Sequence, residues 1–126
     1  MNSITEFTTS AHRKIASLNS LAAVARDSDE WQRLNAKASA MGTATAIITT
    51  LLAEKDGTLM SKASTAETVV MSLKELAEDT LELIYAENPD LTTPESRMWV
   101  VQVGGQREGY RLALETLRQE VIAYAY

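Results

Sequence analysis

The sequence contains no cysteine. Disulfides, thiolate metal sites and thiol nucleophiles are therefore excluded, and a reducing compartment such as the cytoplasm is the expected location. Only two prolines and five glycines interrupt 126 residues, and 45% of the residues are hydrophobic. This composition disfavours disorder, and the length suits one domain. We expect a single folded domain over residues 1–126.

Long hydrophobic runs and an excess of basic residues are also missing. The longest weakly polar run, residues 44–53, is shorter than the roughly 20 apolar residues that span a membrane. The first residues show neither the early positive charge nor the apolar run of a signal peptide. A net charge of −5 disfavours a binder of nucleic-acid phosphates, because such proteins usually carry a basic excess. We expect neither a membrane nor nucleic acid as a partner.

Helical periodicity is what the sequence has in abundance. Apolar residues recur at steps of three and four over residues 3–26, over residues 29–54, and from a start between Thr58 and Thr65 to about Glu87. In the third segment a second row, formed by Val69, Leu76 and Leu83, runs beside the main stripe. Two apolar rows predict that this helix contacts two neighbours.

The fourth segment has the clearest helix start. Thr93 suits the N-cap, Pro94 suits the first helical position, and Glu95 is favourable beside the positive helix end. Nothing in the sequence obliges this helix to end before the chain does. Short connections between long helices predict an all-α fold, a four-helix antiparallel bundle with a long C-terminal helix.

Two glycines in the last helix need an explanation, since each costs up to about 1 kcal/mol relative to alanine. Gly105 and Gly109 have GxxxG spacing, so they share one side of the helix. The segment 29–54 has a middle of small residues that a second backbone could approach closely. We predict a tight crossing between the two helices. A break at Gly104 and an intermolecular contact remain open.

Aromatic residues mark the same helix as a candidate interface. Trp99, Tyr110 and Tyr124 follow one helical stripe, and Tyr126 lies beside it. Such residues are favoured as interface anchors, although the apolar end could equally pack against the bundle. The candidate interface residues are Trp99, Gly105, Gly109, Tyr110, Tyr124 and Tyr126.

Four carboxylates share one flank of the third helix: Glu75, Glu78, Asp79 and Glu82. Their string, LKELAEDTLELIY, resembles a metal-binding helix of the MazG-like nucleotide pyrophosphohydrolases. That resemblance implies a Mg²⁺-dependent all-α hydrolase, with these four acids holding the metal. The family's second ExxD helix has no counterpart here. The other interpretation is a solvated helix face, partly neutralised by Lys74.

No catalytic apparatus is otherwise recognisable. The single histidine, His12, has no partners for a metal site or a triad, and no phosphate-binding glycine loop occurs. Glu108 and Glu115 each precede an arginine by three residues, which predicts local ion pairs along the last helix.

We therefore predict a protein without enzymatic activity or cofactor, which binds a protein partner or forms a homo-oligomer. The string GGQREGYRLALETLR is similar to helices of small bacteriophage proteins. That resemblance implies an accessory protein that binds a host factor, or a virion component. The alternative is the Mg²⁺-dependent hydrolase.

Overall fold

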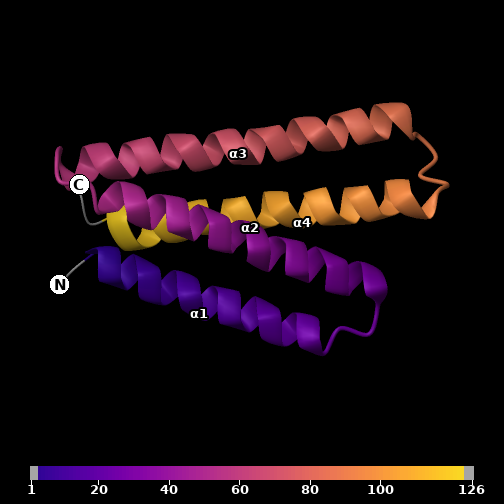
Figure 1. The fold of residues 1–126 in the computed structure, drawn as a ribbon, viewed down its shortest axis with the longest axis horizontal. Helices are drawn as coiled ribbons and strands as arrows, with labels where there is room; N and C mark the ends of the chain where they lie inside the picture. Colours follow the sequence, from indigo (N-terminus) through magenta and orange to yellow (C-terminus); the bar gives the residue numbers. More distant parts are fainter. Residues whose placement is uncertain (1–2, 124–126) are drawn as a thin grey trace.

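Four long helices make up the computed structural model, which describes residues 3–123. The elements are α1 (Ser3–Ala23), α2 (Ser28–Leu52), α3 (Leu59–Glu87), α4 (Pro94–Leu117) and a terminal π-helical turn, η1 (Arg118–Ile122). No strand occurs within residues 3–123, and the four helices pack against one another, so the all-α bundle is confirmed. Figure 1 shows the chain turning back at each connection.

Side-chain caps fix where three of the helices begin. Asp27 accepts a hydrogen bond from the Asp29 backbone N–H at the start of α2. At the start of α3, Thr58 and Ser61 exchange side-chain to backbone hydrogen bonds, which resolves the ambiguity between Thr58 and Thr65. Thr93 caps α4, which begins with Pro94 as predicted. These caps satisfy backbone donors that a helix leaves unpaired in its first turn.

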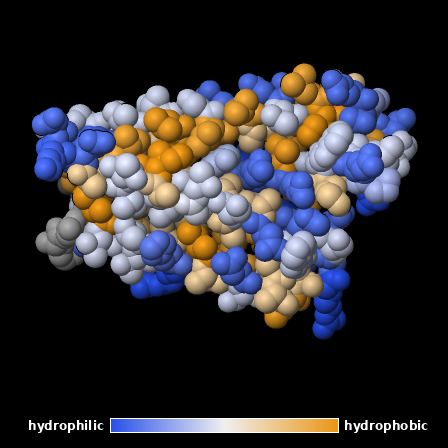
Figure 2. Space-filling view, in the orientation of Figure 1, coloured by the Kyte–Doolittle hydropathy of each residue, from blue (hydrophilic) through white to orange (hydrophobic). Residues whose placement is uncertain are grey.

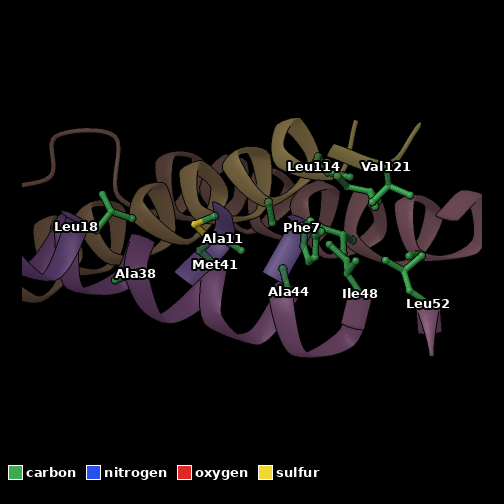
Figure 3. Packing of buried hydrophobic residues seen from close by; sticks show 14 of the residues in the cluster. Phe7, Ala11, Leu18, Ala38, Met41, Ala44, Ile48, Leu52, Leu114 and Val121 are labelled. Atoms are coloured by element: carbon green, nitrogen blue, oxygen red, sulfur yellow. The ribbon is translucent and has the colours of Figure 1, made fainter. Parts of the chain in front are cut away.

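The helices α2 and α4 form the middle of the bundle. They make the most extensive helix-to-helix contact, whereas α1 packs mainly on α2 and α3 mainly on α4. Figure 1 shows α1 and α3 on opposite sides of this central pair. The largest wholly buried apolar side chains belong to α1, α2, α3, α4 and η1. Figure 3 shows Phe7 among Ala44, Ile48 and Leu114 in this core.

The predicted glycine crossing is present. Gly105 and Gly109 are buried, and α4 continues through them without a break. A β-carbon added at Gly105 would collide with the Arg33 carbonyl oxygen, and one added at Gly109 with the Lys37 carbonyl oxygen. The two backbones are therefore in contact, which only glycine permits at these positions.

Ion pairs differ from the predicted local pattern. The Glu108 carboxylate forms an ion pair with Arg33 of α2, at 3.0 Å across the crossing, and not with Arg111 on its own helix. Arg118 reaches Glu67 of α3 at 3.0 Å, also between helices. The local prediction was wrong for Glu108 and Arg118, because helix packing brought an oppositely charged side chain closer than the neighbour along the helix. Glu115 does form a local pair, with Arg111 at 3.6 Å. All of these groups are partly exposed, so each pair stabilises the fold by at most about 1 kcal/mol.

Candidate functional site

Helix α3 contacts two neighbours, α4 and α2, as its two apolar rows predicted, but its second row stays exposed. We call Val69, Leu76 and Leu83 the α3 row. Their exposed fractions are 37%, 63% and 62%, whereas Val70, one residue from the row, is fully buried. The prediction of two neighbours is therefore confirmed for the helix, although most of this row is not covered by them. Figure 2 shows hydrophobic side chains gathered along α3 on the face turned to the reader.

The row is uncovered because α2 and α3 diverge. Lys62 lies seven residues before Val69, at the start of the same row, and its Nζ donates to the Glu54 carbonyl oxygen at 2.8 Å. The row thus begins in contact with the end of α2. Figure 1 shows the two helices separating from that point toward the α3–α4 connection. Val69, the row member nearest that point, is accordingly less exposed than Leu76 and Leu83.

The opposite flank of α3 is occupied by α4 and η1. Arg118 bonds to Glu67 there, and Glu78 and Tyr85 line a hollow with Arg107 of α4. Glu67, Glu78 and Tyr85 follow one another at helical intervals on this flank. The α3 row therefore lies on the flank of α3 that is turned away from α4 and η1.

A groove lies between α2 and α4. Its volume is about 460 Å³. It is lined by uncharged side chains: Trp31, Gln32, Asn35, Ala36, Ser39, Ala40, Thr43, Gln102, Gln106 and Tyr110. The groove, called here the α2–α4 groove, is formed with α4, the helix on which α3 also packs.

The predicted interface residues fall into three groups. Trp99 is 51% exposed, and Tyr110 lines the α2–α4 groove. Gly105 and Gly109 are buried in the helix crossing, so they offer no surface to a partner. Tyr124 and Tyr126 lie outside the described residues.

The sequence did not predict the exposure of several residues of the candidate site. Trp31 fits the heptad stripe of α2, yet it is 48% exposed and lines the groove. Leu76 and Leu83 were assigned to an internal contact. The sequence did carry a signal for this exposure. The third of four helices has two apolar rows, and in so small a bundle one of the rows can remain uncovered.

The acidic flank of α3 is mostly solvated. Glu75, Asp79 and Glu82 are exposed and form no ion pair with any side chain among residues 3–123. Glu78 pairs with Lys74 at 2.9 Å, as the sequence indicated. Within the same residues, no group of three or more histidine, cysteine, aspartate or glutamate side chains is placed to hold a metal ion. His12 is exposed.

The pKa of Glu78 is lowered, first by the hydrogen bond from Lys74 and then by the charges of Lys74 and Arg107. In an NMR titration of the side-chain carboxyls, Glu78 should therefore ionise at a lower pH than a free glutamate. Because the folded-state pKa is depressed, the stability from this pair is present above the ordinary pKa and is lost as the pH falls through the lowered one. Lys74→Gln should return the Glu78 titration toward its ordinary value. Unchanged titration in that variant would contradict the assigned pair.

Comparisons with known proteins give no relative: no family model, curated protein or solved structure matches this chain. Across residues 3–123, no helix combines the length and the apolar character needed to cross a membrane.

Proposed function

We propose that this chain is a non-enzymatic helical protein that binds another protein through the α3 row and the adjoining α2–α4 groove. The observation that carries the proposal is the exposure of Leu76 and Leu83, both above 60%, beside a buried stripe on the same helix. Covering a leucine side chain contributes about 1.5–3 kcal/mol. Contiguous exposed apolar surface commonly marks a protein interaction site.

Exposed aromatic side chains on α2 and α4 also support this proposal. Trp31 and Tyr110 line the groove, and Trp99 is half-exposed on α4. Tryptophan and tyrosine are enriched among residues that dominate binding energy, because they offer large rigid contact areas. The likeness of residues 104–118 to small bacteriophage proteins favours a host factor or another virion protein as the partner.

Site-specific photo-crosslinking tests the proposal. We expect Leu83→p-benzoylphenylalanine, irradiated in the cells that naturally contain the protein, to give a discrete crosslinked product. The reason is that a partner on the α3 row would place C–H bonds within reach of the photoprobe. Denaturing gels and mass spectrometry would measure the product and name the partner.

The control places the same photoprobe at Ser17, which is exposed on α1, across the bundle from α3. The Leu83 product should be lost when Leu76→Arg is added, because a charge in the row opposes burial. Equal crosslinking from Leu83 and Ser17, or a Leu83 product that survives Leu76→Arg, would reject the proposed binding surface.

A further inference from the structure

The α3 row has the length and shape to accept a helix. Val69 and Leu83 are separated by 14 residues, so the row extends for about 21 Å along α3. Apolar residues at heptad spacing are the pattern on which a second helix packs. An amphipathic helix of about four turns matches this length.

Charge around the row specifies the chemistry of that helix. α3 carries six carboxylates and two lysines, and one of the lysines is neutralised by Glu78. Glu75, Asp79 and Glu82 are exposed on the solvent side of the row, without ion pairs to residues 3–123. The side chains that line the α2–α4 groove are uncharged. The surface therefore offers an apolar strip with one acidic border, which lysine and arginine side chains complement.

The same charges disfavour a second copy of this chain as the occupant. Pairing two α3 rows about a two-fold axis through Leu76 places equivalent flanks against each other. Glu75 would then lie close to Glu75 and Asp79 of the second copy, and no basic residue of the row's border could compensate. Like charges in facing positions oppose association.

We infer that the partner presents a basic amphipathic helix, which lies along Val69, Leu76 and Leu83 with its cationic side chains toward Glu75, Asp79 and Glu82. This inference rests on the proposed function, because it names the element that binds at the proposed surface. The exposed leucines supply the apolar contact, and the carboxylates set the orientation and the salt dependence.

Calorimetry with designed peptides tests the inference. The probe is an 18-residue helical peptide with leucines at steps of three and four and lysines elsewhere, and its counterpart carries glutamate in place of lysine. We expect the lysine peptide to bind about tenfold or more tightly than the glutamate peptide at low salt. Leu76→Ala combined with Leu83→Ala should weaken its binding about tenfold, since two apolar contacts are truncated. Circular dichroism checks that each variant remains folded.

A matched pair of charge variants separates a specific site from general attraction to an acidic protein. Glu75→Gln, Asp79→Asn and Glu82→Gln together should weaken binding and flatten its salt dependence. Glu6→Gln, Glu115→Gln and Glu120→Gln remove the same charge elsewhere and should leave the affinity within about twofold. Equal losses in the two triple variants, or no loss on truncating the leucines, would overturn the inference.

Two further outcomes distinguish this inference from the proposed function. If photo-crosslinking at Leu83 succeeds but the lysine peptide does not bind, the basic helix is wrong and the binding surface stands. If light scattering shows a dimer that Leu76→Arg dissociates, the row belongs to a second copy, and the inference is overturned. If crosslinking from Leu83 is no stronger than from Ser17, or survives Leu76→Arg, the proposed function is rejected, and the inference that rests on it is rejected as well.

Discussion

Gly109→Ala should lower the free energy of unfolding by about 2–3 kcal/mol, the range expected for an overpacked contact. The added β-carbon would meet the Lys37 carbonyl oxygen, the Ala40 β-carbon at 2.9 Å and the Met41 backbone nitrogen at 3.0 Å. Backbone atoms cannot rotate away as a flexible side chain can, so α2 and α4 must separate. Urea denaturation followed by circular dichroism measures the change. Gly105→Ala, beside Arg33 and Ala36, should behave in the same way.

Gly104 provides the matched control, because it lies in the same helix with nothing described within 4 Å of an added β-carbon. Gly104→Ala should stabilise the protein by up to about 1 kcal/mol, since alanine is the better helix former. Opposite signs at Gly104 and Gly109 would therefore establish the close crossing. Similar gains at both positions would show that the helices are not in backbone contact.

Phe7→Ala should have the largest effect of any truncation in α1, a loss of about 3–5 kcal/mol. Phe7 is the only phenylalanine and is fully buried. Its ring lies in the core beside Ala44, Ile48 and Leu114, where α1 meets α2 and α4 (Figure 3). Removing it leaves a cavity and weakens the attachment of α1 to the bundle. The midpoint of urea unfolding measures the loss.

Leu21→Ala is the control within α1, because Leu21 is 54% exposed. Its truncation should change the free energy of unfolding by about 0.5 kcal/mol or less. A Phe7 variant as stable as the Leu21 variant would contradict the packing of α1 on the core. Loss of α1 alone, seen as a separate early transition, would instead show that α1 unfolds independently of α2 and α4.

Local chemistry explains why much of the fold could be predicted. Thr93 and Pro94 determine the start of α4 through hydrogen bonding and a fixed backbone angle. Gly105 and Gly109 predicted the crossing because their spacing and their intrinsic penalty both required a close neighbour. Such signals act within one or two helical turns, so the sequence alone carries them.

The candidate site depends on relations between helices, which local patterns do not encode. The exposure of Leu76 follows from the angle at which α2 leaves α3, and that angle is set by the packing of both on α4. Arg33 pairs with Glu108 for the same reason, since the crossing brings them together across 75 positions of sequence. The π-helical turn after Leu117 likewise has no distinct sequence signal. Each feature required the assembled bundle.

The glycine crossing limits how this sequence can evolve. The atoms that exclude a β-carbon at Gly105 and Gly109 include the carbonyl oxygens of Arg33 and Lys37, which every amino acid possesses. A smaller side chain on α2 therefore cannot compensate for a larger one on α4. Second-site revertants of an alanine at either glycine must arise elsewhere, by stabilising the bundle as a whole. Substitutions at Gly105 and Gly109 are therefore disfavoured, whereas the side chains of Arg33 and Lys37 can change without affecting the backbone contact.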